Sequence, residues 1–229
     1  MHPTYIKETT MTLTPIAYME TEFKEKFGIP RQSGLVPELR GTIRFEPAFQ
    51  QEEALRGLEG FSHLWLIWGF SRAEGWTPTV RPPRLGGNTR LGVFATRSPH
   101  RPNPLGLSAV EIEGIEEGII RVRGADLLNG TPIYDIKPYI PYADAIPEAK
   151  GGFANAPPEA VLKVQVSDAL LEKLPIDRQT TLVQVLALDP RPSYQDDPKR
   201  VYGFGFAGFE IKFQVTGEVL TVLDIAAAR

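Results

Sequence analysis

Short strand-like segments separated by turn-forming residues most constrain what the first 140 residues of this 229-residue chain can fold into. The segments are rich in β-branched or aromatic residues and are bounded by Gly, Pro or Asn, a pattern typical of strands. One helix is predicted among them, from Gln50 or Gln51 to Leu58. The predicted strands cover residues 12–19, 39–45, 62–68, 90–96, 108–112, 119–122 and 133–137. Many short strands with long, irregular connections favour an open or closed barrel over a doubly wound sheet.

Two missing motifs disfavour a conventional nucleotide-binding α/β domain. No Gly-x-Gly-x-x-Gly sequence follows a predicted strand. The segment from Leu85 to Gly92 is rich in glycine, but it lacks the Lys-Ser/Thr ending of a phosphate-binding loop. The sequence therefore favours a fold other than a conventional nucleotide-binding α/β domain.

The chain divides into two units around a segment that resists regular structure. Prolines and glycines interrupt any period from Pro141 to Glu159, so we interpret this segment as a linker. The predicted organisation is a first domain at 1–145, a linker at 146–160 and a second domain at 161–229. The second domain is a small α+β unit, with strands at 161–166 and 220–225, helices at 167–174 and 178–188, and a hairpin from 201–206 and 209–216.

Composition excludes several kinds of site. The chain has no cysteine, so it has no disulfide, no thiolate metal site and no cysteine nucleophile. Its histidines, His2, His63 and His100, leave little material for zinc, and no metal is expected. The longest apolar run, from Leu64 to Phe70, is too short to span a bilayer, and no charged-then-apolar leader opens the chain. We therefore expect a cytoplasmic protein with no membrane partner.

The distribution of charge is more informative than its total. A net charge of −3 does not indicate a nucleic-acid-binding protein. Between residues 56 and 101, however, only Glu59 and Glu74 oppose a group of arginines, namely Arg56, Arg72, Arg81, Arg84, Arg90, Arg97 and Arg101. A locally basic segment suits an anionic partner, although a solvated surface patterned by chance explains the same charges.

The segment from Gly92 to Ser108 is predicted to be a rigid turn. Its three prolines lock φ and remove donors, and Gly106 admits conformations closed to other residues. The polar side chains that it displays are Arg97, His100, Arg101 and Asn103. Planar, bidentate donors suit a ligand rich in oxygen or ring-nitrogen acceptors. A structural turn with solvated arginines is the alternative.

Two segments carry weaker signals. The one from Lys26 to Val36 is bounded by Gly and Pro and presents Arg31 and Gln32, but by itself it is more typical of a plain surface loop. In the segment from Gly60 to Phe70, alternation places one set of side chains on one face and His63, Trp65 and Ile67 on the other; the first set is Ser62, Leu64, Leu66 and Trp68. A lone histidine in such a strand is more often a satisfied core residue than a catalyst.

The segment from Asp126 to Tyr142 is the hardest to explain by structure alone. Its Asn129-Gly130 pair predicts a tight turn. A strand bracketed by two prolines follows, and it carries the polar or ionisable residues Tyr134, Asp135, Lys137 and Tyr139. Burying Asp and Lys together is costly unless they pair, so they either form a structural ion pair or belong to a site.

Together these segments resemble the TrmO family, in the same order over nearly the whole chain. The motifs that carry the resemblance are Gly28-Ile-Pro-Arg-Gln, Gly60-Phe-Ser-His-Leu-Trp, Arg81-Pro-Pro-Arg-Leu-Gly-Gly-Asn, the segment from Gly92 to Gly106, the segment from Asn129 to Tyr139, and Asp189-Pro-Arg-Pro-Ser-Tyr194. The resemblance implies a fold of the α+β class, mainly β, with an N-terminal single-sheet β-barrel that binds S-adenosylmethionine and a small α+β C-terminal domain. It also implies a homodimer that methylates N6 of the threonylcarbamoyl-modified adenosine at tRNA position 37.

The same resemblance implies where the cofactor binds. The residues carried over by motif are Pro30, Arg31, Gln32, Phe70, Ser71, Arg97, Leu107, Leu128, Asn129, Gly130 and Thr131. Tight turns offer backbone donors and acceptors to the adenine and methionine ends, and an arginine or an amide N–H suits the carboxylate. The family commonly has Asp where this chain has Asn129, which keeps an acceptor but loses a charge.

The predicted catalytic and RNA-binding residues come from the ionisable strand and the basic segment. Asp135, held near Lys137, is the expected proton acceptor or orienting group, with Tyr139 shaping the pocket and His63 as the competing base. The tRNA anticodon stem-loop is expected to bind Arg81, Arg84, Arg90 and Arg101, and Tyr139 to stack on a splayed base. Arg191 and Tyr194 are expected to contact the tRNA or the other subunit.

Two other functions remain open. The chain could be a non-catalytic RNA-binding module of the same fold, which would not bind S-adenosylmethionine. It could also be a methyltransferase for a protein or a small molecule, which the acidic net charge favours mildly. Within the methyltransferase hypothesis, the segment from Gly92 to Ser108 separates two ligands: Arg97 and Leu107 face the cofactor, and Arg101 faces the RNA.

Overall fold

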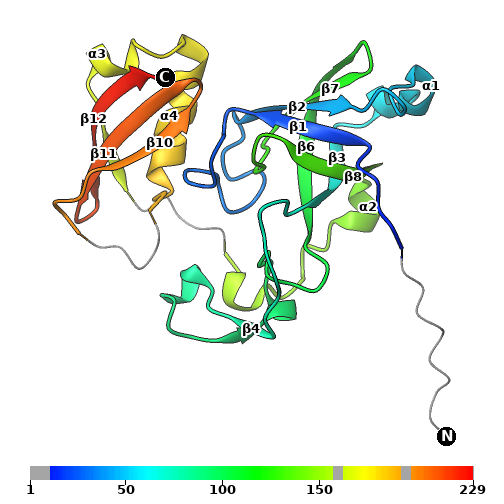
Figure 1. Ribbon diagram of the computed structural model, residues 1–229, viewed down its shortest axis with the longest axis horizontal. Coiled ribbons are helices and arrows are strands. Elements are labelled where there is room, and N and C mark those ends of the chain that lie inside the picture. The colour runs from blue at the N-terminus through cyan, green and yellow to red at the C-terminus, as the bar shows by residue number, and fades with distance from the viewer. Residues whose placement is uncertain (1–10, 157–161, 192–196, 229) are drawn as a thin grey trace, which may run out of the picture.

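The structure, a computed structural model, describes residues 11–156, 162–191 and 197–228. Figure 1 shows a β-barrel on one side, a smaller α+β domain on the other, and a long excursion projecting from the barrel at the bottom of the view. The mainly β class, with an N-terminal barrel and a small C-terminal α+β unit, is confirmed. Within the described residues, no helix combines the length and apolar character needed to cross a membrane.

The barrel is a single closed sheet in which every neighbouring pair is antiparallel. Its strands are β1 (Ala17–Thr21), β2 (Arg40–Phe45), β3 (His63–Gly69), β6 (Leu105–Glu116), β7 (Ile119–Arg123) and β8 (Thr131–Pro138). They follow the order β1-β2-β7-β6-β3-β8, and β1 closes the barrel by pairing with β8. The predicted alternation along β3 is confirmed: Leu64, Leu66 and Trp68 share one face, which is buried in the barrel, and the intervening residues lie on the outer face.

Between β3 and β6 the chain makes the excursion, residues 70–104. It contains a two-stranded sheet of β4 (Thr79–Val80) and β5 (Leu91–Gly92), and the short 3₁₀ helices η2 (Pro83–Leu85) and η3 (Val93–Ala95). The strand predicted at 90–96 is therefore wrong beyond Gly92. The Thr96 amide and hydroxyl both donate to the Val93 carbonyl, at 3.1 and 2.8 Å, and this local turn replaces a ladder.

Two other predicted elements differ in detail. The helix expected at 50–58 is split into α1 (Glu52–Leu55) and the 3₁₀ helix η1 (Leu58–Gly60), because Gly57 between them has φ +86°. The segment from Pro141 to Glu159, interpreted as a linker or its approach, contains two short helices in its described part, α2 (Pro141–Asp144) and the 3₁₀ helix η4 (Gly152–Ala154).

The C-terminal domain is a four-stranded sheet covered by a helix. Its elements are β9 (Lys163–Gln165), α3 (Asp168–Leu171), α4 (Ile176–Ala187), β10 (Tyr202–Phe206), β11 (Phe209–Thr216) and β12 (Val219–Ala227). The strand order is β10-β11-β12-β9, with the last pair parallel. The predicted hairpin is confirmed, and its turn places Ala207 and Gly208 at positive φ.

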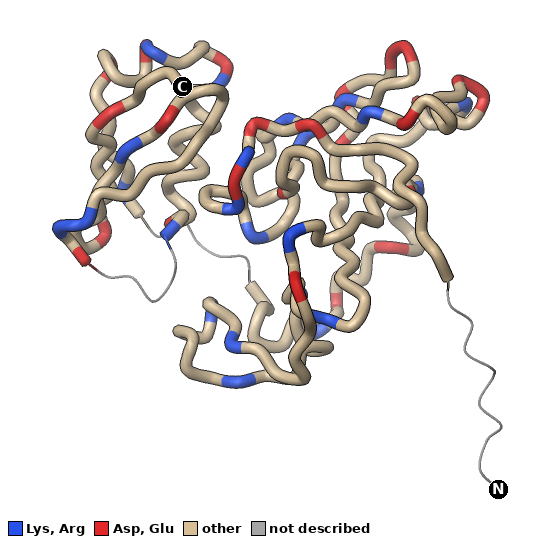
Figure 2. The backbone as a smooth tube through the Cα atoms, in the orientation of Figure 1, with Lys and Arg blue, Asp and Glu red and all other residues tan. Residues whose placement is uncertain are grey.

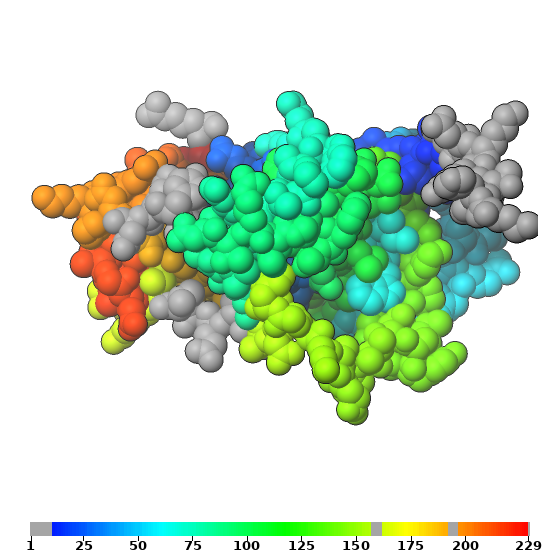
Figure 3. Space-filling model, turned by 90° about the horizontal axis from the view of Figure 1, so that it is seen from below, coloured from blue at the N-terminus to red at the C-terminus, as the bar shows by residue number. Residues whose placement is uncertain are grey.

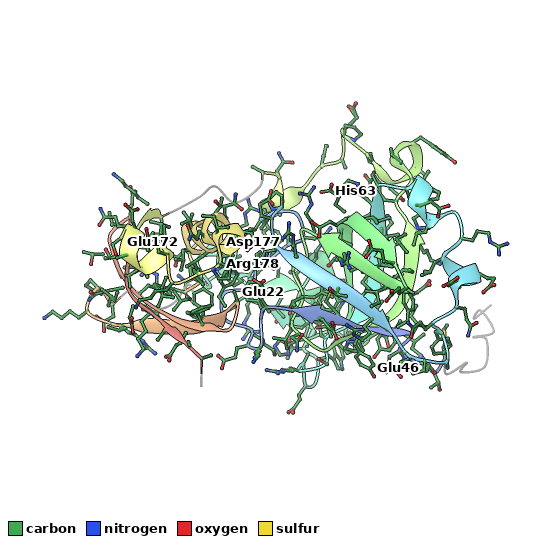
Figure 4. The ribbon with its side chains drawn as sticks, turned by 90° about the horizontal axis from the view of Figure 1, so that it is seen from above. Glu22, Glu46, His63, Glu172, Asp177 and Arg178 are labelled. Atoms are coloured by element: carbon green, nitrogen blue, oxygen red, sulfur yellow. The ribbon has the colours of Figure 1, made fainter. Side chains whose placement is uncertain are left out.

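The segment that connects β1 to β2 belongs to the core of the C-terminal domain. Phe23, Val36 and Leu39 are buried with the apolar residues of α4 and of the second sheet, and the Phe23 and Phe206 ring centroids are 5.8 Å apart. Figure 4 shows Glu22, Asp177 and Arg178 together where the two domains meet, and Arg178 is ion-paired with Glu22. The two domains thus share a continuous apolar contact, and the loop that carries the predicted cofactor residues 30–32 lies in the shared segment.

Candidate active site

Three neighbouring strands, β6, β3 and β8, form the part of the barrel wall where the predicted catalytic residues lie: His63 is on β3, Asp135 and Lys137 are on β8, and Tyr139 directly follows β8. Pairing across the sheet sets these residues in rows: Leu107 with Ile67 and Asp135, Ala109 with Trp65 and Lys137, and Glu111 with His63, beside which Tyr139 continues β8. All of them project away from the buried Leu64, Leu66 and Trp68. The structure therefore brings Asp135, Lys137, Tyr139 and His63 onto one face, which we call the outer face.

Asp135 and Lys137 form an ion pair, with 2.8 Å between Oδ2 and Nζ. Their side chains are 45% and 62% exposed, so the pair is not buried. Water screens such a pair, and it contributes little to stability. The carboxylate is therefore accessible to an approaching ligand, and the cost of burying an unpaired Asp or Lys does not arise here.

Aromatic rings line the same face. The Tyr139 ring lies 5.5 Å from Trp65 and 6.2 Å from His63, measured between centroids. The Tyr139 amide also donates to the His63 carbonyl at 2.9 Å. His63 is exposed and has its Nδ1 2.9 Å from the Ser62 hydroxyl, so it is not a core histidine. These rings, tilted against one another, form an aromatic surface on the same face as the ion pair.

A second group of predicted residues meets near one end of the barrel. Arg97 donates from Nη1 to the Gln32 side-chain oxygen, which joins the excursion to the loop between β1 and β2. Phe70, which follows β3, packs edge-on against Trp68 with 4.4 Å between ring centroids. Pro30 is buried, whereas Arg31 and Ser71 are exposed. Among the residues predicted to bind the cofactor, Arg97 and Gln32 are thus in direct contact and form what we call the Arg97 cluster, whereas Leu107 lies on the outer face.

The turn from Leu128 to Thr131 anchors the end of β1. The Asn129 side-chain oxygen accepts from the Thr21 amide at 3.0 Å, and the Asn129 amide donates to the Phe23 carbonyl at 2.8 Å. Gly130 has φ +77°, which a glycine adopts without strain. Since an aspartate would accept the same hydrogen bond, the contact to Thr21 does not depend on the charge that this chain lacks.

Sequence reasoning assigned no role to Asp126, which lies beneath the Arg97 cluster. The Ser108 hydroxyl donates to Asp126 Oδ1 at 2.7 Å, and Trp68 Nε1 donates to the same hydroxyl oxygen at 3.0 Å. Burial raises the pKa of the Asp126 carboxyl, while hydrogen bonds from Ser108 and from the Ser33 backbone, and the charge of Arg97, oppose that rise. An acidic residue between the buried Ala125 and Leu127 was the only signal in the sequence.

Tyr134 is a second residue without an assigned role. The pairing of β3 with β8 is irregular here, because Ile67 pairs with Asp135 whereas Trp68 pairs with Ile133. The bulge leaves Tyr134 over Gly69, where an added Cβ would lie 2.8 Å from the Tyr134 ring. Bulges of this kind redirect side chains and are frequent next to active sites.

The predicted RNA-binding arginines have unequal surroundings. Arg81 is exposed, Arg90 donates to the Thr79 hydroxyl at 2.8 Å, and Arg84 donates to the Ala156 carbonyl. Figure 2 shows several basic segments along the excursion, and Figure 3 shows the excursion covering much of the face seen from below. Arg101 instead donates to the Thr96 carbonyl at 2.9 Å, so it stabilises its own loop.

The remaining predicted contact lies in the C-terminal domain. The Arg191 side chain is only 10% exposed and is paired with Asp189 at 2.9 Å, so the structure does not display it as a surface cation. Tyr194 lies outside the described residues. In the part of the chain that the structure describes, no group of three or more His, Asp or Glu side chains is placed to hold a metal ion.

The fold and these clusters define a class: two-domain proteins with a single-sheet closed barrel, a polar and aromatic outer face and a partly buried acid that is hydrogen-bonded to the barrel. The chain belongs to the tRNA-methyltransferase O family. The model of the tRNA-methyltransferase O N-terminal domain matches residues 18–145, and that of the TrmO C-terminal domain matches residues 159–228. The family membership inferred from the motifs is confirmed.

Named relatives and a solved structure agree with this membership. The chain is 42% identical over 216 residues to the Escherichia coli K12 tRNA (adenine(37)-N6)-methyltransferase, covering 88% of this chain and 92% of that protein. It is 45% identical over 227 residues to a Pseudomonas aeruginosa protein named "Putative S-adenosylmethionine-dependent methyltransferase RcsF", covering 95% of this chain and 98% of that one. A crystal structure of TrmO from P. aeruginosa superposes with a TM-score of 0.80 at 40% identity, covering 97% of this chain and 99% of that one.

Proposed function

We propose that this chain transfers a methyl group from S-adenosylmethionine to N6 of adenosine 37 in tRNA, and that the adenosine carries a threonylcarbamoyl group. The observation that carries the proposal is the exposed Asp135 carboxylate in the row of Leu107 and Ile67, beside an aromatic surface, in a chain that is similar over most of its length to a tRNA (adenine(37)-N6)-methyltransferase. The N-terminal domain at 1–145 would carry the reaction.

The donor set around Arg97 fits such a cofactor. S-adenosylmethionine combines a carboxylate, an ammonium, a ribose and an adenine ring, and when bound it supplies an electrophilic methyl group on a positive sulfonium. Arg97 offers a guanidinium for the carboxylate, and the turn from Leu128 to Thr131 offers backbone groups for the polar edges. Gln32 and Phe70 extend the same cluster. No thiolate or metal is needed for a transfer of this kind.

Asp135 is the better placed of the two candidate bases. His63 and Asp135 lie at opposite ends of the face. Asp135 pairs with Ile67 of β3, and His63 lies four residues before Ile67 on the same strand. Four residues of strand span about 13 Å, so the two side chains cannot serve the same proton. Asp135 shares its row with Leu107, a predicted cofactor residue, whereas His63 lies beside Tyr139.

The proton balance follows from the substrate. The N6 lone pair is delocalised into the threonylcarbamoyl carbonyl, so the nitrogen is a poor nucleophile until its proton leaves. Asp135 accepts that proton, N6 forms the new bond to the methyl carbon, and the carbon–sulfur bond breaks. Lys137 holds the carboxylate, and Tyr139 and Trp65 stack on the base. Alignment supplies most of the remaining acceleration.

The excursion is proposed to bind the anticodon stem-loop. Arg81, Arg84 and Arg90 are exposed residues on it, and phosphate contacts supply most of the affinity for RNA.

We also propose a homodimer in the cytoplasm, the compartment of tRNA modification. Exposed apolar side chains support a partner surface, since Phe94 is 74% and Leu107 51% exposed. Light scattering of the purified chain tests the dimer.

Mass spectrometry of nucleosides tests the reaction. Purified chain is incubated with S-adenosylmethionine and two tRNA preparations that differ only in the threonylcarbamoyl group at adenosine 37. We expect one added methyl group on the modified nucleoside and none on the unmodified one. Methylation of both contradicts the threonylcarbamoyl requirement. Methylation of neither, by a chain that binds S-adenosylmethionine in calorimetry, contradicts the tRNA substrate and favours a protein or small-molecule acceptor.

A further inference from the structure

Asp126 joins three segments that are distant in the sequence. It follows β7 and accepts a hydrogen bond from Ser108 of β6. The Ser33 backbone, in the loop between β1 and β2, acts on the same carboxyl, and so does the charge of Arg97 in the excursion. The loop and the excursion are also joined directly by the hydrogen bond from Arg97 to Gln32. Asp126 therefore lies beneath the point where the two loops meet.

The direction of each hydrogen bond below Asp126 is fixed by chemistry. An indole N–H can only donate, so the Ser108 hydroxyl must accept from Trp68 Nε1, at 3.0 Å. The hydroxyl proton is then directed to Asp126 Oδ1, at 2.7 Å. Ser108 is 1% exposed, so water does not compete for these bonds. The chain Trp68 to Ser108 to Asp126 thus presents an acceptor toward the loops and needs no proton on the carboxylate.

A glycine at position 106 provides the space that the Trp68 ring needs to take part in these hydrogen bonds. Trp68 pairs with Gly106 across β3 and β6, and a Cβ at Gly106 would lie 2.3 Å from the indole ring. Only a glycine lets the ring lie over β6 and reach Ser108, two residues along the strand. Phe70 then packs on the indole at 4.4 Å between ring centroids. The Trp68 indole therefore contacts both Ser108, the hydrogen-bond partner of Asp126, and Phe70, a predicted cofactor residue.

We propose that Asp126 is a positioning residue that holds Arg97 and the loop carrying Gln32 in place for S-adenosylmethionine, an inference that rests on the proposed function. The Asp126 carboxylate is partly buried, and desolvation makes it costly to leave without compensating charge or donors, so the Arg97 charge and the Ser33 backbone that act on it favour holding both loops near the barrel. With Arg97 oriented from below, its remaining donors are directed toward the cofactor carboxylate. Asp126 itself acts through Arg97 and Ser33.

Calorimetry of three proteins tests this role. Asp126→Asn keeps an acceptor for Ser108 but removes the charge opposite Arg97. Glu113→Gln is the matched control, because it neutralises a barrel carboxylate that is ion-paired with Arg40 instead, with 3.1 Å between Oε1 and the Arg40 Nε. We expect Asp126→Asn to weaken the binding of S-adenosylmethionine and of S-adenosylhomocysteine about tenfold, and Glu113→Gln to leave both unchanged.

Kinetics separate positioning from a general loss of structure. We expect Asp126→Asn to raise KM for S-adenosylmethionine while kcat and tRNA affinity stay near wild type. Equal loss of cofactor and tRNA binding, or wild-type cofactor binding by Asp126→Asn, overturns the role. If thermal unfolding shows that this variant does not fold, Ser108→Ala is measured instead and is expected to weaken cofactor binding about threefold; unchanged binding overturns the role. A wild-type chain that does not bind S-adenosylmethionine contradicts the proposed function itself.

Discussion

Two carboxylates on neighbouring parts of the barrel have opposite surroundings. Asp135 lies on the outer face, about half exposed and paired with Lys137, whereas Asp126 is hydrogen-bonded beneath two loops and burial raises its pKa. Asp135, the exposed acid, can accept a proton from the substrate at little cost to the stability of the fold. The partly buried acid, Asp126, can hold neighbouring groups in place because leaving its charge without partners is costly. One region is arranged for reaction and the other for orientation, and the following predictions test that division.

The largest expected effect is on catalysis at Asp135. Asp135→Asn removes the proton acceptor, so we expect single-turnover methylation at saturating cofactor and tRNA to fall by about 10²- to 10⁴-fold. Because the side chain is exposed, thermal stability should change little. Rapid-quench assays with radiolabelled cofactor measure the rate. His63→Gln is the comparison variant, and a larger loss for it than for Asp135→Asn would exchange the roles of the two residues.

The next largest effect is on the stability of the buried region. Gly106→Ala places a Cβ 2.3 Å from the Trp68 ring, which must then shift away from Ser108. We expect a loss of about 1–3 kcal/mol in the free energy of unfolding, measured by urea titration. Gly92→Ala is the control, since nothing lies within 4 Å of its added Cβ. If both variants lost the same free energy of unfolding, the close contact between Gly106 and the Trp68 ring would not contribute to stability.

The two regions also differ in how far the sequence predicts them. Alternation predicts that Leu64, Leu66 and Trp68 share one face, because a strand has a side-chain period of two; the closed barrel then decides that this face is the buried one. The same period places Asp135 and Lys137 together on β8. Asp126 escaped prediction because its partners, Ser108, Ser33 and Arg97, come from three segments that only the closed barrel brings together.

Local hydrogen bonds explain two further differences from prediction. The apolar run after Gly92 has strand composition, but the Thr96 side chain and amide close a turn on Val93. The bulge opposite Trp68 cannot be read from the sequence, because it depends on the partner strand; it shifts the pairing so that Tyr134 lies over Gly69. The motifs indicate roles for the site residues, and the structure shows which of them lie together: Asp135, Lys137, Tyr139 and His63 on the outer face, and Arg97 with Gln32.

A smaller effect is expected where RNA meets the excursion. Arg84→Glu reverses an exposed charge, so we expect tRNA binding to weaken about tenfold and the salt dependence of binding to become shallower. Cofactor affinity should not change, since Arg84 contacts the Ala156 carbonyl rather than the Arg97 cluster. Fluorescence anisotropy with a labelled anticodon stem-loop measures the change. Arg101→Ala is the contrasting variant. Because Arg101 stabilises the loop that carries Arg97, we expect this variant to bind both tRNA and S-adenosylmethionine more weakly.

The smallest expected effect is on how stability depends on pH. Burial raises the pKa of Asp126, so the folded state binds this proton more tightly than the unfolded state does. The contribution of this group is therefore most favourable at low pH and is lost as pH rises from the unfolded pKa through the folded one. Ser108, Ser33 and Arg97 oppose the shift and keep the effect small. Urea unfolding at several pH values should show a shallower decline over that interval in Asp126→Asn than in wild type. Asp135→Asn should leave the wild-type slope unchanged, and an equal change in both variants would mean that the two carboxylates do not differ as the structure indicates.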